Sequence, residues 1–199
     1  SGKVVNAEAG NTVTVSVGGH SYTATVQDNL TWSVDVPGSV LTALGNGDLT
    51  VTASVTNGVG NSGSGERDIT IDANLPGLRV DTVAGDDVIN SIEHGQNLVI
   101  TGSSDGLTAG TALTVTVNGK TYPATVLADG TWSAAIPSAD VSALAAGTVT
   151  VTVEGQSSAG NPVTMNHDVT VDLANVAISI NALATDDVIN ATEKGADLV

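Results

Sequence analysis

The chain repeats itself with a period of 100 residues, and this repetition constrains its fold more than any other feature. The stretch VGGHSYTATVQDNLTWSVDVP (Val17–Pro37) aligns with VNGKTYPATVLADGTWSAAIP (Val117–Pro137) without a gap. The same spacing relates Trp32 to Trp132, Tyr22 to Tyr122, Asp72 to Asp172 and Asp86 to Asp186. A period this long holds a whole domain, so the sequence predicts an array of separate domains and not a solenoid of single turns.

Each repeat is predicted to consist of short strands, because apolar and polar residues alternate with a period of two. The predicted strands lie at residues 77–83, 97–103, 112–119, 121–128, 131–137, 147–155 and 163–172. Turn signals separate several of them, among them Asn118-Gly119, Asp129-Gly130 and Gly160-Asn161. About seven strands in about 100 residues predict an all-β fold of immunoglobulin-like sandwiches in tandem. Residues 139–146 are expected to form at most a brief helical turn.

The phase of the repeat predicts how the chain divides into domains. A complete repeat is expected at 74–173, whereas 1–73 lacks its first two strands and 174–199 holds the first two strands of a further repeat. Missing strands leave bare sheet edges. We therefore expect strand exchange, in which the C-terminal segment of one copy completes residues 1–73 of another, head to tail or as a swapped pair. The alternative is that the two terminal segments become ordered in some other way.

The charge of the chain limits the classes of partner that it is expected to bind. Acidic residues number 21 and basic residues 5, for a net charge of −16. Nucleic acid and anionic membrane surfaces are not expected as partners, because both need a basic surface. No apolar run approaches the roughly 20 residues that span a bilayer, so membrane insertion is not expected in this segment. Cysteine is absent, which excludes disulfides and thiolate metal sites.

No arrangement of residues predicts an enzyme. The serines lack the G-x-S-x-G pattern of a nucleophile elbow, and the glycine-rich stretch Gly58–Gly65 lacks the lysine of a phosphate-binding loop. We interpret the three histidines as solvated surface residues, since the other repeat carries Lys or Arg at each matching position. The tryptophans lie within alternating strands, so we interpret them as core residues and not as platforms that stack on sugars.

One acidic cluster occurs twice, as GDDVINSIEHG (Gly85–Gly95) and as TDDVINATEKG (Thr185–Gly195). Four acidic or amide residues are identical in the two copies: Asp86, Asp87, Asn90 and Glu93 in the first, and Asp186, Asp187, Asn190 and Glu193 in the second. Calcium takes six to eight oxygen ligands in a flexible geometry, and a cation offsets the repulsion between clustered carboxylates. The alternative is a solvated turn that the aspartates cap. We favour a calcium site.

Topology adds further ligands to this predicted site. The loop after the first strand lies at the end of the sandwich where the last strand also ends, so Asp172 is expected near the first cluster. By the same argument Asp72 belongs beside the second cluster, if a partner molecule delivers it. The loops at 103–105 and 155–161 of the following repeat are close enough to contribute as well.

Several runs of residues in this chain resemble those of a known protein family. The runs IDANLPGLRVDTVAGDDVIN (Ile71–Asn90) and LTVTVNGKTYPATVLADGTWSAAIP (Leu113–Pro137), with the SAGN loop (Ser158–Asn161), are similar to the bacterial immunoglobulin-like repeats of giant type I-secreted adhesins and biofilm-associated proteins. The resemblance implies a secreted, extracellular protein at the bacterial cell surface, with tandem repeats that form a stalk stiffened by calcium at the junctions. The linker at 172–176 departs from the family pattern, because it lacks the proline present at Pro76.

Two functions follow as hypotheses. The first is a structural extender, or stalk, whose partners are the neighbouring repeats of the same protein. The alternative is a carbohydrate- or receptor-binding module, which would need exposed aromatic side chains. Aromatic residues make up only 2% of this chain, so the sequence favours the extender.

Overall fold

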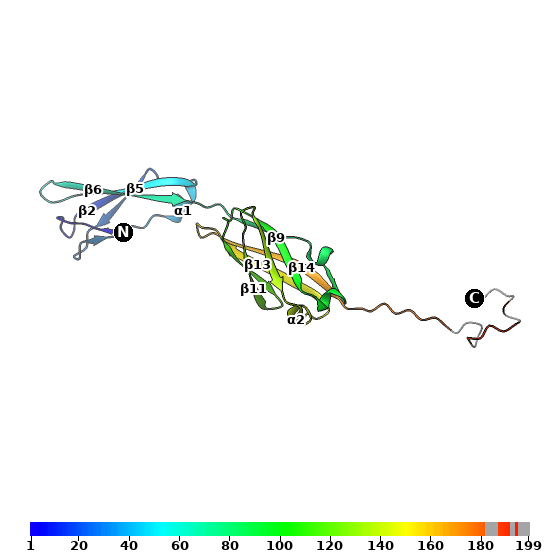
Figure 1. Ribbon diagram of the computed structural model, residues 1–199. Coiled ribbons are helices and arrows are strands. Elements are labelled where there is room, and N and C mark those ends of the chain that lie inside the picture. The colour runs from blue at the N-terminus through cyan, green and yellow to red at the C-terminus, as the bar shows by residue number, and fades with distance from the viewer. Residues whose placement is uncertain (182–186, 192–193, 195–199) are drawn as a thin grey trace.

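The computed structural model describes residues 1–181, 187–191 and 194. It contains two β-rich units, each with its own hydrophobic core, and a C-terminal segment that extends away from them (Figure 1). Following the sequence period, we name residues 1–73 repeat 1, residues 74–173 repeat 2 and residues 174–199 the tail.

Repeat 2 is a sandwich of two sheets, as the alternating pattern predicts. A five-stranded sheet has the order β11-β10-β13-β14-β8, and a three-stranded sheet has the order β12-β9-β7. The strands are β7 (Gly77–Val80), β8 (Val88–Asn90), β9 (Leu98–Asp105), β10 (Ala112–Val117), β11 (Lys120–Thr125), β12 (Thr131–Ile136), β13 (Gly147–Gln156) and β14 (Pro162–Asp172). The short helical turns are η1 (Val83–Gly85), η2 (Glu93–Gly95) and α2 (Ser138–Val141).

The core of repeat 2 is built from the inward-facing residues of both sheets. Trp132 and Ile100 from the smaller sheet meet Val115 and Val153 from the larger one, and all four side chains are fully buried. Alternation along each strand places these residues on one face and threonine on the other. Trp132 is therefore a core residue, as expected.

The strand prediction for repeat 2 missed one element, β8. This strand is only three residues long, and it pairs in parallel with the end of β14, Thr170 opposite Val88 and Asp172 opposite Asn90. Its sequence lies inside the acidic cluster and carries too few residues for an alternating pattern to be visible. The brief helical turn expected at 139–146 is α2, which begins one residue earlier.

Repeat 1 contains fewer strands than repeat 2. A four-stranded sheet has the order β3-β2-β5-β6, and a two-stranded ladder joins β1 to β4. The elements are β1 (Gly2–Lys3), β2 (Thr12–Val17), β3 (His20–Thr25), β4 (Thr31–Trp32), α1 (Gly38–Ala43), β5 (Gly47–Thr56) and β6 (Ser62–Ile71). Its buried core is small and consists of Val13, Val15, Val17, Ala24 and Val26.

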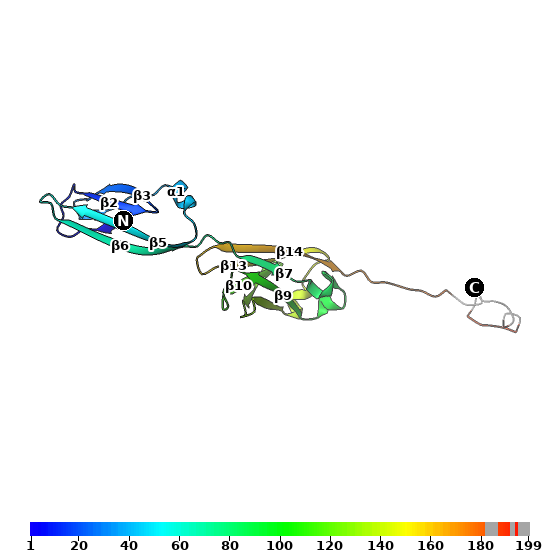
Figure 2. The same cartoon turned by 90° about the horizontal axis from the view of Figure 1, so that it is seen from above.

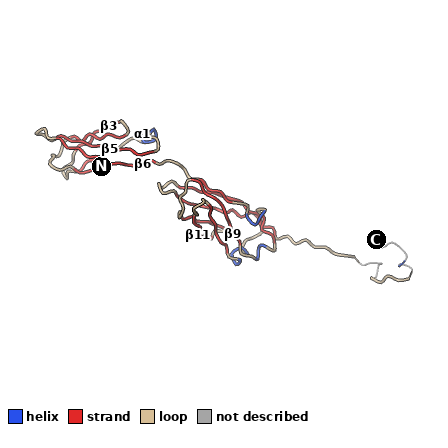
Figure 3. The backbone as a smooth tube through the Cα atoms, turned by 45° about the horizontal axis from the view of Figure 1, so that its top comes forward, coloured by secondary structure: helices blue, strands red, loops and turns tan. Residues whose placement is uncertain are grey.

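The two repeats follow one another end to end, and the tail leaves repeat 2 at the end far from repeat 1 (Figures 1 and 2). The long strand β14 ends where the tail leaves, so the first and last residues of repeat 2 lie at opposite ends (Figure 1). The backbone tube shows the same order of repeat 1, repeat 2 and the beginning of the tail (Figure 3). In the part of the chain that the structure describes, no helix has the length and apolar character needed to cross a membrane.

Candidate functional site

The first acidic cluster forms a tight loop between β7 and β9. Asp87 has a left-handed backbone (φ 61°), and its Oδ1 atom accepts a hydrogen bond of 2.8 Å from the Val83 N–H. Asp86 Oδ1 accepts a hydrogen bond of 3.0 Å from the Val88 N–H. Aspartate tolerates the left-handed region and readily caps nearby backbone N–H groups. These two residues therefore shape the turn that leads into β8.

The second half of the cluster is held by a reciprocal pair. Asn90 Oδ1 accepts hydrogen bonds from the N–H groups of Ile92 (2.9 Å) and Glu93 (3.1 Å). Glu93 Oε2 in turn accepts one of 3.1 Å from the Asn90 N–H. This reciprocity is the arrangement of a capping box, and it holds the turn that leads from Asn90 into η2. The turn-capping role weighed in the sequence analysis is thus present at all four positions of the cluster.

The last strand of repeat 2 brings Asp172 to the same end of the sandwich. Asp172 stands opposite Asn90 in the parallel pairing of β14 with β8. The Thr170 N–H donates to the Asp87 carbonyl oxygen over 2.9 Å, which closes the ladder. Asp172 Oδ1 caps the Ala174 N–H at 2.9 Å. The loop and the beginning of the next linker are therefore neighbours.

The chemistry of this donor set suits calcium, whereas its side chains do not converge on one point. All the candidate groups offer oxygen, the ligand atom that calcium prefers. The hydrogen bonds above use one oxygen of each carboxylate, and the second oxygen takes no part in them. Within the described residues, however, no three acidic or histidine side chains come together as a metal-binding group. The described residues thus offer the oxygen ligands that a calcium site uses, but their side chains are not arranged around a common point.

His167 contacts the acidic loop, which corrects its interpretation as a solvated surface residue. Its Nε2 atom lies 2.7 Å from Asp87 Oδ1, and its side chain is only 21% exposed. The hydrogen bond from His167, with that from Val83, lowers the pKa of the Asp87 carboxyl below its ordinary value of 3.8. His94 is also half-buried, with Nε2 2.9 Å from the Leu144 carbonyl oxygen, while His20 is exposed as expected. The sequence did not predict these contacts, because Lys or Arg stands at the matching positions of the other repeat and this suggested a solvated surface.

The second acidic cluster lies in the tail and is only partly described. Asp187 has nearly the same left-handed backbone (φ 63°) as Asp87, and Asn190 lies three residues beyond it. Asp186 and Glu193 fall outside the described residues. Asp72 lies in the linker between the repeats, where Oδ1 caps the Asn74 N–H at 3.1 Å. Within one chain Asp72 lies at one end of repeat 2, and the described beginning of the tail leaves from the other end (Figure 1).

Two asparagines at the junction escaped the sequence analysis as functional residues. Asn161 Nδ2, from repeat 2, donates to the carbonyl oxygens of Asp72 (3.0 Å) and Asn74 (2.9 Å) in the linker. Asn46, from repeat 1, accepts from the Ala73 N–H (2.9 Å) and donates to Asn74 Oδ1 (2.9 Å). Together the two repeats therefore hold linker residues 72–74, and both contact Asn74. The sequence placed Asn161 in the loop at 155–161 that was expected near the junction, but no pattern singled out its side chain or that of Asn46.

Solved structures of bacterial adhesins share this fold. A Ca²⁺-stabilized adhesin with which an Antarctic bacterium reaches out and binds ice is 30% identical, with 96% of this chain and 48% of that chain covered and a TM-score of 0.53. A 1.5-MDa bacterial ice-binding adhesin, described for its host cell surface retention, is 33% identical, with 92% and 60% covered and a TM-score of 0.51. The chain belongs to the immunoglobulin-like repeats of large bacterial adhesins.

Further comparisons set the scope of this membership. This chain spans 48% of the first of those two solved chains and 60% of the second. A bacterial immunoglobulin-like domain of the M. primoryensis ice-binding adhesin is 30% identical, with 50% of this chain and 100% of that domain covered and a TM-score of 0.40. No family model matches the sequence, and no curated protein matches it either.

Proposed function

We propose that this chain is a structural extender, a stalk segment of a bacterial adhesin that acts outside the cell at its surface. The observation that carries the proposal is the junction, where hydrogen bonds from Asn46 and Asn161 fix the same linker from both sides. A linker held by both neighbours limits bending between repeats, and the end-to-end arrangement turns each added repeat into added length (Figure 1). Length and stiffness are the two properties that a stalk needs.

Calcium binding at the acidic loop is the second part of this proposal. The loop and Asp172 adjoin the linker that follows repeat 2, so a cation bound there would offset their negative charge next to a junction. The description of one related adhesin as Ca²⁺-stabilized supports the proposal. In the bound state Asp86, Asp87, Asn90, Glu93 and Asp172 would supply the oxygens, and Asp72, Asp186, Asp187, Asn190 and Glu193 would do so where a tail meets repeat 1.

Thermal unfolding with calcium and with chelator tests the calcium proposal. Calcium that binds only the folded state raises the melting temperature, by linkage. We expect the double variant Asp86→Asn plus Asp87→Asn to lose most of this rise, because it removes two charges and keeps an amide oxygen for each turn cap. Asp81→Asn is the matched control, since Asp81 is exposed and outside the loop. An undiminished calcium effect in the double variant would show that the ion binds elsewhere.

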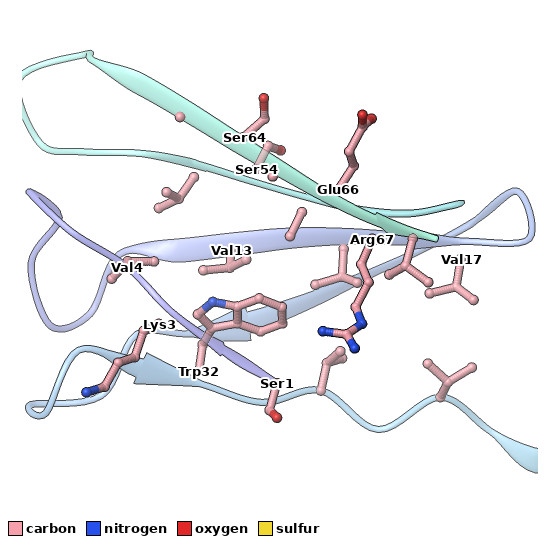
Figure 4. Close-up of a pocket in the computed structure, with 18 of the residues that line it drawn as sticks. Ser1, Lys3, Val4, Val13, Val17, Trp32, Ser54, Ser64, Glu66 and Arg67 are labelled. Carbon is pink, nitrogen blue, oxygen red and sulfur yellow. The ribbon is translucent and has the colours of Figure 1, made fainter. Parts of the chain in front are cut away.

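Among the residues that the structure describes, no observation favours the ligand-binding alternative. Trp32 is the aromatic side chain best placed to meet a ligand, because it lines an open groove in repeat 1 (Figure 4). Its counterpart Trp132 is fully buried in repeat 2. The exposure of Trp32 therefore reflects the smaller number of strands around it and not a surface built for sugars.

A further inference from the structure

The short strand β8 connects the beginning of repeat 2 to its last strand. β7 and β8 follow one another along the chain but lie in different sheets, since β7 pairs with β9 and β8 pairs with β14. We propose that the pairing of β8 with residues 170–172 of β14, together with the contacts of Asp87, resists tension along the stalk. We call this set of contacts the β8–β14 lock. The inference rests on the proposed role as an extender, because a stalk segment is pulled at both ends.

Tension reaches repeat 2 at its two opposite ends. The linker enters beside Asn161, whose Nδ2 donates to the Asn74 carbonyl oxygen over 2.9 Å, and the chain leaves after Asp172 (Figure 1). Force therefore pulls the chain that leads into β7 toward repeat 1, and it pulls the end of β14 in the other direction. β8 is connected to the first point and β14 to the second. Their pairing is thus stretched between two opposing pulls.

The parallel direction of the two strands decides how this pairing is stretched. Val88 stands opposite Thr170 and Asn90 opposite Asp172, so both strands run toward the end where the tail leaves. The pull on β8 acts at its first residue, whereas the pull on β14 acts at its last. The strands can separate only by sliding past one another, and the hydrogen bonds across the ladder then stretch together. Bonds that share the force in this way resist more than the same bonds opened one after another.

The number of paired residues shows which connection gives way first. β13 pairs with β14 at ten positions, whereas β7 pairs with β9 at four and β8 with β14 at three. The long ladder between β13 and β14 is therefore the stronger attachment of β14. When β7 slides along β9, β8 still joins the first part of repeat 2 to the last strand. The β8–β14 lock is thus the final barrier before the sandwich opens.

Asp87 strengthens the lock at the end of β8 on which the force acts. Its carbonyl oxygen accepts a hydrogen bond of 2.9 Å from the Thr170 N–H. Its Oδ1 atom lies 2.7 Å from His167 Nε2 and accepts a hydrogen bond of 2.8 Å from the Val83 N–H. The residue just before β8 is therefore attached to β14 through its main chain and through its side chain.

The hydrophobic core also opposes sliding. Ile89 and Val171 stand opposite one another in the ladder, and each is only 2% exposed. A slip of one residue turns every side chain of a strand to the other face, so Ile89 would leave the core. Exposing an aliphatic side chain to water is unfavourable. Sliding thus breaks the ladder and exposes part of the core in one step.

Cysteine handles test the proposal by setting the direction of pulling in optical tweezers, because the chain has no cysteine of its own. Leu75→Cys plus Val176→Cys pulls repeat 2 along the stalk. Ile92→Cys plus Val176→Cys pulls β8 and β14 apart from the same end, so their bonds open one after another. The three side chains are 79%, 100% and 77% exposed for Leu75, Val176 and Ile92, so the handles should not disturb the fold.

The lock predicts a severalfold higher unfolding force along the stalk than across the two strands. Both double variants are made in the 199-residue chain and pulled at neutral pH in chelator. The gain in tether length assigns each event, since the two handle pairs enclose different numbers of residues. Equal forces in the two directions would overturn the proposal, because β8 and β14 would then resist sliding no better than peeling.

A proline substitution tests the ladder itself. Thr170→Pro removes the N–H that Asp87 accepts. N–H groups along a strand point alternately to its two edges, so the ladder with β13 keeps its own bonds. Thr164→Pro is the matched control, since Thr164 lies on the same edge, six residues before the part of β14 that β8 contacts. We expect Thr170→Pro to lose most of the difference between the two pulling directions and Thr164→Pro to keep it.

Denaturant unfolding of the same variants separates mechanical strength from stability. Forced unfolding follows the rate of unfolding and not the equilibrium free energy. A Thr170→Pro variant that folds and keeps its full strength along the stalk would overturn the proposal. If this variant does not fold, His167→Ala weakens the lock through Asp87, and it should lower the same force while His20→Ala should not. Both handles enclose repeat 2 alone, so a flexible junction or a failure of the calcium proposal leaves these outcomes unaffected.

Discussion

At the scale of single residues, aspartate and asparagine give this protein its turns and its contacts between elements. Asp87 adopts a left-handed backbone, caps Val83, and accepts from His167 eighty residues later. One side chain therefore ties the acidic loop to β14. The contact joins a short loop with few buried groups to an inner strand of the larger sheet.

The pKa of Asp87 should make repeat 2 sensitive to acid through this contact. A carboxyl with a lowered pKa in the folded state contributes stability above its unfolded value near 3.9, and this contribution is lost as pH falls through the folded pKa. In His167→Ala the largest cause of the lowering is gone, so Asp87 should titrate at higher pH and acid unfolding should begin at higher pH. Carboxyl NMR titration and unfolding curves over pH measure both effects.

Two variants serve as controls for this prediction. His167→Arg, the residue found at position 67, should keep the Asp87 pKa low. His20→Ala changes an exposed histidine and should leave acid unfolding as it is. An Asp87 that titrates identically with and without His167 would contradict the assignment of cause.

At the scale of elements, the sandwich depends on a close approach between a glycine and a tryptophan. Gly102 in β9 faces Trp132 in β12 and Val80 in β7. A Cβ atom at Gly102 would lie 2.0 Å from the Arg79 carbonyl oxygen and 2.4 Å from Trp132 Cζ2. Because strand backbone cannot yield as a flexible side chain can, this position requires glycine.

Gly102→Ala should therefore destabilise repeat 2 by about 3 kcal/mol or more, because it overpacks the core against backbone. The corresponding variant Gly2→Ala brings its Cβ only to 2.8 Å from a half-exposed Trp32, and it should cost less than about 1 kcal/mol. Denaturant unfolding followed by tryptophan fluorescence measures both, with one tryptophan in each repeat. Equal effects at the two positions would mean that the surroundings of Trp32 are as closed as those of Trp132.

At the scale of the whole molecule, the junction decides whether two repeats behave as one rod. Asn46 and Asn161 hold residues 72–74 from opposite sides. The position one period after Asn46 is Ala146, and the position one period after Asn74 is Ala174. The linker that follows repeat 2 therefore lacks the asparagine pair, and it also lacks the proline. We expect this linker to be less stiff than the one between the repeats.

Asn161→Ala should loosen the first junction without unfolding either repeat. The variant removes two hydrogen bonds to linker carbonyls, each of which contributes about 1 kcal/mol. Small-angle scattering should show a broader distribution of lengths, and residual dipolar couplings should align the two repeats less alike. Asn61→Ala, the matched position in repeat 1, should change neither, and an unchanged alignment in Asn161→Ala would count against the asparagine clamp.

The period, the sandwich class and most strands could be predicted from the sequence alone, because they depend on local alternation and on turn residues such as Asn118-Gly119. It also indicated that Asp172 and the acidic loop share one end of a repeat, since strand direction follows from topology. Membership of the adhesin repeats agrees with the resemblance seen in the sequence.

Other features could be seen only in the three-dimensional structure, because no local pattern of residues encodes them. These are contacts between residues far apart in the chain: the pairing of β8 with β14, the partners of His167 and His94, and the hydrogen bonds from Asn161 to the linker. Each contact depends on how the strands pack and not on the neighbouring residues in the sequence. For repeat 1 the sequence predicted that two strands are missing, and the structure adds which side chains are left exposed, among them Leu41 and Ile69.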